Sequence, residues 1–553
     1  MGKLSKVIGQ YEEAEHLPAS VISLPPMASS ATFNGGFDWD ATIGLPDHIL
    51  DLVGGTVRGN PVLPHGANTP GTVRWQLDSG LRHDVSDGII TFGFATMRHA
   101  LGLNNNPGFG EGGGYSPFTP EQMAAARIAI TNWDDLIAAR FVEIQPGPGA
   151  SSYGRQTTDI VLANTYTGPA QAWAYYPGYG RQYERIAGDV WIADPAYNSS
   201  NGQLEPGQYG LQTLNHELGH AIGLNHPGAY NYGDGNGDIT YDTDAEYFQD
   251  SNQFTIMSYF DSYETGAQPI DWNLMRFVYP STPMVDDVRV IQQIYGADMT
   301  TRIGNTRYGF NATGDVTNEA MRFVANEMAT VFTIWDAGGT DTLDLSGYYT
   351  DSVIDLREGA YSSAGGWGAF NPSLIGVDPT LATINANNIA SGLGLRTQRL
   401  FDIYFEGGVS DDGGATFVNE GVSWRDITGT GERLLMEQNI GIAYGAVIEN
   451  AVGGHGNDRI NGNSATNSFT GGGGADIFII ARYGVGDRSV DTITDFVSGT
   501  DRIDLSELHV TAARVTFDAA SHQLRVDTDG IGGYDLAVIV TNSSVNLATD
   551  LIF

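Results

Sequence analysis

The sequence predicts an α+β domain followed by an all-β domain that ends as a parallel β-roll or β-sandwich. Strand-like and helix-like patterns mix up to about residue 298, and helical periodicity nearly vanishes after about residue 300. Residues 453–479 repeat every nine residues. Mixed strands and helices predict a sheet that backs helices, whereas a nonapeptide period is typical of stacked parallel strands.

Length and charge narrow the class of protein. The 553 residues are too many for one ordinary domain, and we expect two or three. Lys and Arg total 27 against 65 Asp and Glu, a net charge of −38, so we expect no nucleic-acid partner and no membrane insertion. The excess of Asp and Glu can serve to keep the protein soluble. Alternatively, many of these carboxylates can be ligands of cations. Cysteine is absent, which excludes disulfides, thiolate zinc sites and cysteine nucleophiles.

The first half contains the mixed pattern. Residues 1–70 are rich in Pro, Gly and Ser, and we interpret them as a prosegment or a loosely packed N-terminal extension. The alternation in TVRWQLD and IITFGFAT, between 72 and 96, predicts strands. PEQMAAARIAITNWDDLIAAR (120–140) has helical spacing and predicts a long helix. We further expect strands at 159–164 and 171–177 and helices at 210–224 and 285–295. Together these elements form a first domain over 71–298.

The second half, 299–553, is expected to consist of short strands. In IWDAGGTDTLDLSGY (334–348) short apolar pieces alternate with turn residues. The repeat units GGHGNDRIN, GNSATNSFT and GGGGADIFI begin at 453, 462 and 471. Their eighth residues, Ile460, Phe469 and Phe478, are all large and apolar, which predicts strands that stack around a common core.

A histidine motif is the strongest functional signal. HELGHAIGLNH (216–226) fits the pattern H-E-x-x-H-x-x-G-x-x-H. His216 and His220 lie four positions apart, so on a helix both imidazoles project from one face and can bind one metal ion. Gly223 gives the freedom to end the helix and reverse the chain, which returns His226 as a third ligand. Three neutral nitrogens with one open position are typical of a catalytic zinc site.

Glu217 supplies the chemistry that such a site needs. Zinc lowers the pKa of its water toward about 7 and polarises the scissile carbonyl of a peptide. Glu217 can take the proton from the attacking water and pass it to the leaving amine. H-E-x-x-H alone recurs by chance, but the extended motif fixes more positions and makes a chance match improbable. The motif therefore predicts a zinc endopeptidase with Glu217 as general base.

The segment TIMSYF (255–260) adds two residues to the predicted site. Met257 alone would be ordinary core packing. With the extended motif it is typical of a Met-turn, a methionine bend beneath the zinc ligands. Tyr259 lies two residues further on, where it can reach the metal or the oxyanion of the substrate.

These motifs resemble the serralysin family of secreted bacterial metzincins, which carry a calcium-binding RTX β-roll. Beyond the zinc motif, several blocks match the family in its order and cover roughly 75–551. They are QAWAYYPG (171–178), FTIMSYF (254–260), IYGADMTTRIGNTRYGFNA (294–312), IWDAGGTDTLDLSGY (334–348), IENAVGGHGND (448–458) and DTITDFVSGTDRIDLSEL (491–508). The resemblance implies a metzincin catalytic domain followed by a β-roll domain.

The resemblance also implies roles for particular residues. His216, His220 and His226 match the ligands of one zinc ion, and Glu217 matches the catalytic base. Tyr259 matches a tyrosine that ligates zinc in the resting enzyme and swings to support the transition state. The strand formed by Gln171, Ala172, Trp173 and Ala174 matches the edge to which an extended substrate adds as a further strand.

Several structural calcium ions are implied as well. Arg302, Gly304 and Thr306 match carbonyl ligands paired with Asp336, Gly338 and Asp341, and a second site matches Gly339, Asp341, Val447 and Glu449. In the repeat, turns on the same side start 471 − 453 = 18 residues apart. One calcium should lie between Gly454, Gly456 and Asp458 of one turn and Gly471, Gly473 and Asp476 of the next. Carbonyls and carboxylates suit this hard cation, and the middle unit has lost its aspartate, so we expect fewer ions.

The family implies how the chain leaves the cell. The N-terminus has no apolar core of signal-peptide length, and no apolar run approaches the ~20 residues that span a bilayer. Serralysins use a type I secretion apparatus and an uncleaved C-terminal signal, and the ending Asp550-Leu551-Ile552-Phe553 resembles that signal. We therefore expect a secreted, extracellular and monomeric zymogen, or one retained at the cell surface, that acts on protein or peptide substrates.

One segment departs from the family. Residues 368–435 resemble an insertion, with strand-like pieces such as RLFDIYFEGG (399–408), and the sequence assigns it no role. One alternative function is a processing protease dedicated to one surface protein. Another is a calcium-dependent binding module with an inactive protease domain, although the intact Glu217 argues against it.

Overall fold

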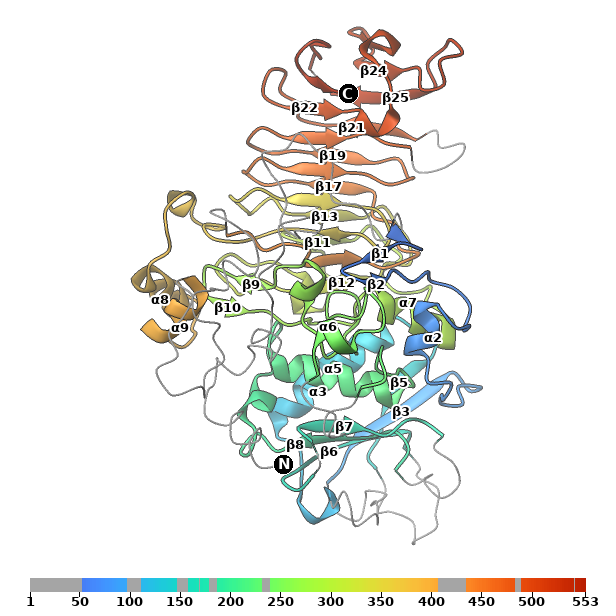
Figure 1. The fold of residues 1–553 in the computed structure, drawn as a ribbon, viewed down its shortest axis with the longest axis vertical. Helices are drawn as coiled ribbons and strands as arrows, with labels where there is room; N and C mark the ends of the chain where they lie inside the picture. Colours follow the sequence, from blue (N-terminus) through green and yellow to red (C-terminus); the bar gives the residue numbers. More distant parts are fainter. Residues whose placement is uncertain are drawn as a thin grey trace.

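The computed structural model describes residues 52–96, 111–146, 158–168, 170–178, 186–230, 239–405, 434–482, 489–541 and 543–553. The elements of the first half gather at one end of an elongated molecule, and the strands of the second half stack away from them toward the C-terminus (Figure 1). None of the helices in these described ranges is long and apolar enough to cross a membrane.

A six-stranded sheet forms the base of the first half. Its strands are β3 (Ile89–Phe94), β4 (Tyr115–Ser116), β5 (Arg140–Glu143), β6 (Ile160–Thr165), β7 (Ala172–Ala174) and β8 (Asp189–Ala193). The order is β5-β3-β6-β8-β7, and β4 pairs with β6. The first four strands of that order run parallel, whereas β7 lies antiparallel to β8 at the edge. This mixed sheet confirms the strands expected at 159–164 and 171–177.

Three helices accompany this sheet: α3 (Pro120–Asp134), α5 (Tyr209–Ala221) and α7 (Val285–Tyr295). Thr119 and Gln122 form a capping box at the start of α3, which fixes where that helix begins. Trp133 is fully buried, and its indole N–H donates to the Asn215 carbonyl at 3.2 Å. This packing of α3 on α5 holds the histidine-bearing helix over the sheet.

Two expectations for the first half are wrong. TVRWQLD does not form a strand, because Val73–Leu77 is helix α2: Thr72 caps the Trp75 N–H, and Val73 and Leu77, four residues apart, are both buried. The long helix expected over 120–140 ends at Asp134, whose carboxylate accepts a 2.6 Å hydrogen bond from the Phe141 N–H and turns the chain into β5.

The N-terminal part of the described chain is packed against the body. Residues 52–70 carry the hairpin β1 (Thr56–Val57) and β2 (Asn60–Pro61). Val62 is buried in a cluster with Phe248, Val285 and Tyr444. His65 bonds Asp286 at 2.6 Å. Residues 52–70 thus touch the body at Val62 and His65 while most of their side chains stay exposed, and residues 1–51 lie outside the described residues.

Two sheets of mostly parallel strands form the second half. One has the order β11 (Arg307–Gly309), β13 (Thr342–Asp344), β17 (Asn450–Val452), β19 (Ser468–Thr470), β21 (Val490–Ile493), β25 (Leu536–Val540), β24 (Gln523–Val526) and β23 (Val515–Asp518). The other has the order β14 (Val353–Asp355), β18 (Arg459–Asn461), β20 (Ile477–Ile479), β22 (Arg502–Asp504) and β26 (Leu551–Ile552).

The nine-residue repeat is visible in these sheets. Strands β17 to β20 start at 450, 459, 468 and 477 and alternate between the two sheets. Asn450 pairs in parallel with Ser468, and Arg459 pairs with Ile477. Their central apolar side chains Ala451, Ile460, Phe469 and Phe478 are fully buried. The expectation of an all-β second half is confirmed outside the segment expected as an insertion.

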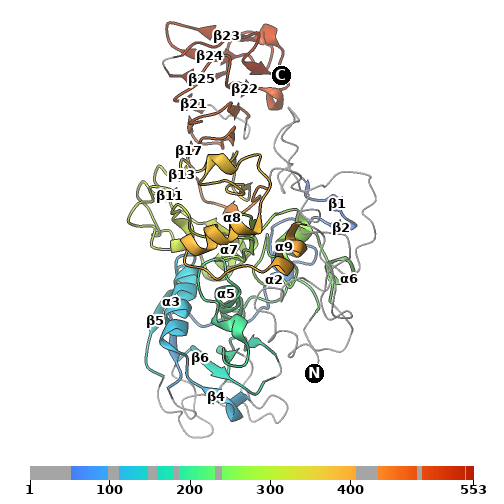
Figure 2. The ribbon, with the colours of Figure 1, turned by 90° about the vertical axis from the view of Figure 1, so that its left-hand side faces the viewer.

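That segment contains helices instead. Helix α8 spans Leu381–Ala390 and α9 spans Gln398–Phe405, so the strand expected in RLFDIYFEGG is wrong over its first seven residues, and 406–408 lie outside the described residues. Both helices pack beside the hairpin β9 (Ile270–Asp271) and β10 (Arg276–Phe277) (Figure 1). Figure 2 shows α8 and α9 on the face of the molecule that is turned toward the viewer there. The rings of Tyr404 and Phe405 on α9 lie 6.4 and 5.5 Å from the Trp272 ring, and Leu400, one turn earlier, packs on the same cluster.

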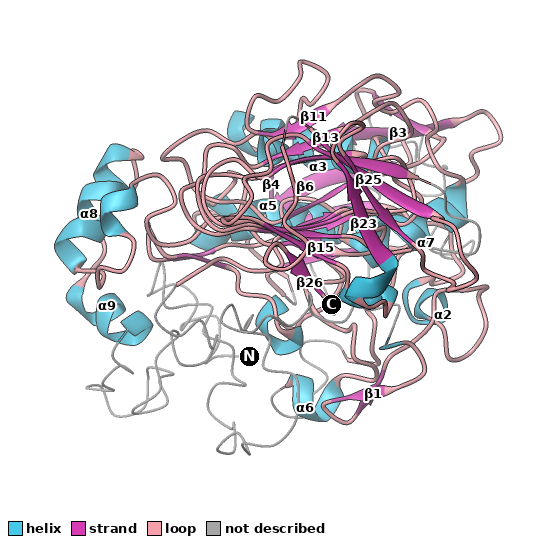
Figure 3. Cartoon of the chain, turned by 90° about the horizontal axis from the view of Figure 1, so that it is seen from above, coloured by secondary structure: helices cyan, strands magenta, loops and turns pink. Residues whose placement is uncertain are grey.

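The remaining elements are short. They are α6 (Tyr241–Asp244), the strands β12 (Phe332–Ile334), β15 (Tyr361–Ser362) and β16 (Ile440–Ile442), and single 3-10 turns at Glu111–Gly113, Ser199–Gly202, Ser262–Thr265, Glu319–Met321, Pro372–Leu374, Ser506–Leu508 and Ala512–Arg514. Seen from above, loops make up much of the surface around the sheets (Figure 3).

Candidate metal centre

Three histidine side chains converge at the end of α5. The Nε2 atom of His226 lies 3.3 Å from Nε2 of His216 and 3.0 Å from Nε2 of His220. These three residues are the only group of three or more possible His, Cys, Asp or Glu metal ligands found among the described residues. The structure therefore brings together the three ligands that the motif predicted.

The other ring nitrogen of two of these histidines is fixed by the backbone. His216 Nδ1 lies 2.8 Å from the Ile256 carbonyl oxygen, and His220 Nδ1 lies 2.8 Å from that of Leu224. A carbonyl accepts only from a protonated nitrogen, so each Nδ1 carries the hydrogen and each Nε2 presents a lone pair. Burial lowers the pKa of His216 to about 4 and that of His220 well below its usual value, which keeps both imidazoles neutral. The arrangement fits a zinc ion.

A sharp turn after the helix returns the third histidine. Gly223 has φ +109°, a backbone conformation that favours glycine, and a Cβ there would collide with the Leu81 carbonyl. The Leu224 N–H donates to the Gly219 carbonyl at 2.8 Å, and the Asn225 N–H donates to the Leu77 carbonyl at 2.7 Å. Helix α2 thus anchors the returning chain and sets the position of His226.

Met257 lies beneath the histidines. Its side chain is fully buried, and its sulfur packs so closely on Gly219 that a Cβ at that glycine would collide with it. The turn is held by Asp287 on α7, whose carboxylate accepts from the Ile256 N–H at 2.7 Å and the Thr255 hydroxyl at 2.6 Å. No sequence signal identified Asp287, because 30 residues separate it from Met257 and no spacing relates them.

Glu217 is buried beside the histidines with one unpaired oxygen. Its side chain is 5 % exposed, and Oε2 has no hydrogen-bond partner among the described residues. Burial raises the pKa of Glu217 to about 8. A buried carboxylate without a partner is costly unless a ligand completes the site, so this oxygen marks a place where a polar group binds.

Tyr259 lies against the same cluster. Its ring centroid is 4.5 Å from that of His226 and 6.1 Å from that of His216, and the residue remains 39 % exposed. Tyr259 is therefore close enough to the histidines to act on a substrate bound there.

The expected substrate strand lies at the edge of the sheet, but its first side chain points inward. Gln171 Nε2 donates to Asn201 Oδ1 at 2.7 Å, and Gln171 Oε1 accepts from the Tyr209 hydroxyl at 2.7 Å. Trp173 stacks on Trp191 with ring centroids 6.3 Å apart. Ala172 and Ala174 are half-buried in the same strand. The Gln171 and Trp173 side chains thus contact the protein interior, and all four residues remain half-buried.

The first two predicted calcium sites occupy a common set of loops. Thr306 N–H donates to Asp341 at 2.7 Å, and the Asp341 N–H donates to Glu449 at 2.7 Å. A Cβ at Gly339 would collide with the Gly304 carbonyl, so these two loops touch. The pair Asp336 and Gly338 shares a 2.9 Å hydrogen bond, Arg302 has the left-handed φ of 50°, and the Val447 side chain is exposed.

The carboxylates in these loops are crowded. Burial raises the pKa of Asp341 to about 7, and the charges of Asp336 and Glu449 add to the effect. One oxygen of Asp341 is buried without a hydrogen-bond partner in the described part of the chain. A cation would satisfy that oxygen and offset the repulsion, so the residues present fit the implied calcium.

The turns of the repeat stack as expected at an 18-residue offset. The Gly473 N–H donates to the Gly454 carbonyl at 2.9 Å, and the Asp458 N–H donates to Asp476 Oδ1 at 2.9 Å. Gly456 and Gly471 lie in the same two turns, where a Cβ at Gly474 would collide with the Gly456 carbonyl and the Gly471 N–H donates to Asp495 at 2.9 Å. Asp495 was not identified from the sequence.

The fold and the site thus define a protein with a cluster of three histidines joined to an all-β domain. Residues 297–376 and 424–551 match the family model described as Peptidase M10 serralysin C terminal. The chain is 30 % identical to Metallopeptidase AprA of Pseudomonas marginalis over 493 residues, which cover 81 % of this chain and 83 % of that protein. The chain belongs to the serralysin family.

Other relatives match over a shorter part. Serralysin C of Dickeya chrysanthemi is 42 % identical over 255 residues, which cover 46 % of this chain and 49 % of the relative. Serralysin of Proteus mirabilis is 30 % identical over 355 residues, 64 % of this chain and 56 % of the relative. The chain thus matches about half the length of these relatives. The family model omits 377–423, which lies within the expected insertion.

Proposed function

We propose that this protein is a zinc-dependent endopeptidase of the metzincin type. The observation that carries the proposal is the convergence of three histidine Nε2 atoms beside a buried Glu217 oxygen without a partner. His216, His220 and His226 would hold the ion, with the backbone carbonyls keeping each donor nitrogen available.

A zinc ion held there supplies a Lewis acid for the scissile carbonyl and lowers the pKa of water. Glu217 accepts the proton of the attacking water at its unpaired Oε2 and delivers it to the leaving amine. Its raised pKa suits it to carry that proton, and a nearby cation brings the pKa back toward the working pH. Tyr259, exposed beside His226, donates to the developing oxyanion.

Substrates would bind as an extra strand along β7. Ala172, Trp173 and Ala174 pair with β8 on one side, so their other edge is available to a peptide backbone. Because the Gln171 and Trp173 side chains are turned into the protein, recognition along this edge rests on main-chain hydrogen bonds. Such binding favours broad sequence tolerance in the segments next to the cut.

The second half would be a calcium-loaded RTX β-roll. Its acidic turns then order when the chain meets external calcium, after export through a type I secretion apparatus. We propose that the protein acts outside the cell as a monomer. An alternative function is a processing protease for one surface protein. The insertion favours this alternative because it adds a second structured surface beside the catalytic half.

The test combines metal analysis with a protease assay. Glu217→Ala should retain one zinc per chain and lose about 10²–10⁴-fold of casein hydrolysis, the usual cost of removing a general base. Glu205→Ala is the control, since Glu205 is exposed in the loop before α5. Near-normal turnover by Glu217→Ala would overturn the mechanism, and a zinc-free wild type that digests casein would overturn the metal assignment.

A further inference from the structure

A buried carboxylate beside the histidine cluster joins two segments of the chain. Asp250 is fully buried, and its Oδ1 atom accepts from the Tyr230 hydroxyl at 2.7 Å and from the Ser258 hydroxyl at 2.7 Å. Tyr230 follows the third histidine, His226, and Ser258 directly precedes Tyr259. One oxygen atom therefore holds the chain that follows His226 against the chain that carries Tyr259.

The ring of Tyr230 forms a wall beside Tyr259. It stacks on the His226 imidazole, with centroids 5.8 Å apart and an interplanar angle of 18°, and its centroid lies 5.1 Å from that of the Tyr259 ring. The Tyr259 ring in turn lies 4.5 Å from His226. The three rings thus form a triangle in which Tyr230 and His226 border Tyr259.

The two tyrosines of this triangle differ in how firmly they are held. Tyr230 is 5 % exposed and its hydroxyl is bonded to Asp250, whereas Tyr259 is 39 % exposed. Burial together with a hydrogen bond removes rotamer freedom from a side chain, while exposed side chains change rotamer readily. Tyr230 is therefore the fixed surface against which the more exposed Tyr259 ring is placed.

The Asp250 carboxylate depends on the two hydroxyls. No other group in the described part of the chain donates to it, and its Oδ2 atom is buried without a partner. A buried carboxylate that loses one of two donors carries a larger uncompensated desolvation cost. The Tyr230 hydroxyl is therefore coupled through Asp250 to Ser258 and to the backbone that leads into Tyr259.

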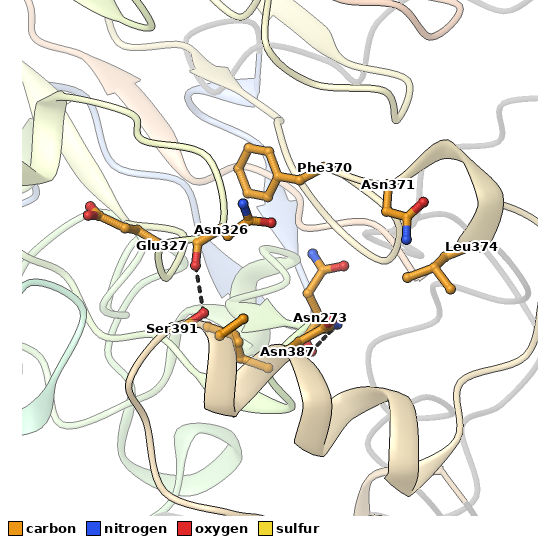
Figure 4. Close-up of a pocket in the computed structure, with 10 residues that line it drawn as sticks. Asn273, Asn326, Glu327, Phe370, Asn371, Leu374, Asn387 and Ser391 are labelled. Atoms are coloured by element: carbon orange, nitrogen blue, oxygen red, sulfur yellow. Dashed lines mark hydrogen bonds between the residues drawn. The ribbon is translucent and has the colours of Figure 1, made fainter.

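The hollow between the insertion and the body has no such arrangement (Figure 4). Asn273 and Asn387 are among the residues that line it, and none of its lining residues carries a buried polar side-chain atom without a partner. Its lining also includes none of the histidines and neither Tyr230 nor Tyr259. The unsatisfied Asp250 oxygen thus belongs to the surroundings of the histidine cluster and not to the hollow.

We propose that Tyr230 and Asp250 are positioning residues for Tyr259. The inference rests on the zinc endopeptidase proposed above and adds two residues that act on the reaction only through Tyr259. They keep the Tyr259 ring beside His226, so that its hydroxyl meets the developing oxyanion without first being reordered. A donor that is already in place stabilises a transition state more than one that must be reoriented.

The first measurement is spectroscopic and does not depend on turnover. Cu(II) accepts imidazole ligands as zinc does, and a tyrosine oxygen bound to it gives a phenolate-to-copper charge-transfer absorption. In the copper-exchanged protein, Tyr259→Phe identifies the part of this band that belongs to Tyr259. Tyr230→Phe keeps the ring and removes only the hydroxyl, and it should lower that band by about half or more at equal copper content, as expected for the loss of a buried hydrogen bond.

The second measurement separates kcat from KM in the zinc enzyme. Tyr230→Phe and Ser258→Ala each remove one donor to Asp250, and both should lower kcat for a peptide about 5–10-fold. KM and zinc content should stay within about twofold of the wild-type values, because neither residue binds the ion or the edge strand. Agreement between the two variants assigns the effect to the shared carboxylate.

The matched control is Tyr241→Phe. Tyr241 is fully buried in the same aromatic cluster as Tyr230, but its hydroxyl donates to the Phe248 carbonyl at 2.8 Å and not to Asp250. This variant also loses one buried hydroxyl and should keep the wild-type band and kcat. An unchanged band and kcat in Tyr230→Phe, or equal losses in Tyr241→Phe, would overturn the inference.

Failure of the proposed function looks different. A wild type without zinc or without peptidase activity would overturn the endopeptidase itself. A copper band that is the same in the wild type and in Tyr259→Phe would refute the approach of Tyr259 to the metal, and the positioning role would fall with it. An active wild type with a Tyr259-dependent band and indifferent Tyr230 and Ser258 variants would overturn the positioning role alone.

Discussion

The position of His216 depends on a residue far from it in sequence. His216 Nδ1 donates to the Ile256 carbonyl, and the N–H of that same Ile256 donates to Asp287. Asp287 also accepts from the Met284 N–H at 2.8 Å, so one carboxylate ties the start of α7 to the turn beneath the metal centre. Outer partners of this kind orient a metal ligand without touching the ion.

Removing this carboxylate should therefore weaken zinc binding. We expect Asp287→Asn to lower zinc affinity about 10–100-fold, the usual effect of losing an outer partner, while the protein remains folded. Competition with a chromophoric chelator measures the change. Asp286→Asn is the control, because the adjacent Asp286 bonds His65 and not the turn. Equal zinc affinity in both variants would show that the turn keeps its shape without Asp287.

The proximity of His216 and His220 could be predicted from sequence because helix geometry converts a spacing of four into a shared face, and the turn at Gly223 returns His226 to them. Asp287 could not, since its partners are brought together only by tertiary packing. The inward direction of Gln171 was also missed for this reason: its partners Asn201 and Tyr209 lie on two other elements.

At the scale of elements, Gln171 joins the edge strand to α5, the helix that carries His216 and His220. Its side chain reaches both Tyr209 at the start of α5 and Thr213 one turn later, the latter at 3.2 Å. The Ala193 N–H donates to the Gln171 carbonyl at 2.8 Å, which continues the pairing of β7 with β8. One amide side chain thus links the edge strand β7 to helix α5.

We expect Gln171→Ala to impair substrate positioning more than zinc binding. KM for a peptide of six or more residues should rise roughly tenfold, consistent with the loss of a few hydrogen bonds, while kcat and zinc content change little. Steady-state kinetics with the exposed Gln145→Ala as control measures this. A fall in kcat with unchanged KM would instead place Gln171 in the chemical step.

Elements whose hydrophobic pattern fits only one secondary structure were predicted well. The wrong predictions fall on segments whose pattern fits both a helix and a strand. The helix expected at 285–295 has those bounds, and the repeat strands lie nine residues apart. In TVRWQLD the apolar residues alternate as in a strand. Val73 and Leu77 also lie on one face of a helix, and in the structure both are buried on that face. The segment 399–405 is likewise apolar enough for either form until Trp272 of the hairpin provides a surface.

The middle repeat unit shows what replaces a missing aspartate. Asn467 takes its place, and the neighbouring Asn463 Nδ2 donates to the carbonyls of Leu356 and Ile448 at 3.0 and 2.8 Å. Side-chain amide hydrogens thus bond carbonyls on this side of the stack, whereas the opposite side carries the buried carboxylates of Asp458 and Asp476, which accept from backbone N–H groups. This difference supports a calcium requirement confined to one side.

At the scale of the whole molecule, the two halves should be stabilised by different interactions. The first half has Trp133, Trp191 and many aliphatic side chains in its core, whereas the first two repeat units each bury one large apolar residue, Ile460 and Phe469. Removing calcium should therefore expose the second half first. Hydrogen exchange with a calcium-selective chelator should deprotect 450–480 and leave 210–226 unchanged. Protection of 450–480 that ignores calcium would show that packing alone holds the stack.

The calcium-free stack should also respond to pH in a defined direction. Burial, with nearby Asp501 and Asp495, raises the pKa of Asp476 to about 7, and burial with Asp476 raises that of Asp458 well above its usual value. In the unfolded chain both groups titrate near ~3.9. Between about pH 4 and 7 the folded state therefore binds more protons than the unfolded state, so its stability falls as pH rises through this window.

Exchange rates of 450–480 in the calcium-selective chelator, corrected for the intrinsic effect of pH, should accordingly be slower at pH 5.5 than at pH 8. With calcium present, exchange of 450–480 should instead be slower at pH 8 than at pH 5.5, because calcium binds the ionised carboxylates and competes with protons. Asp476→Asn removes one of the titrating groups without changing the size of the side chain, so its calcium-free exchange should depend less on pH. If wild type and Asp476→Asn showed the same pH dependence, the repulsion within the stacked turns would have to arise from other carboxylates.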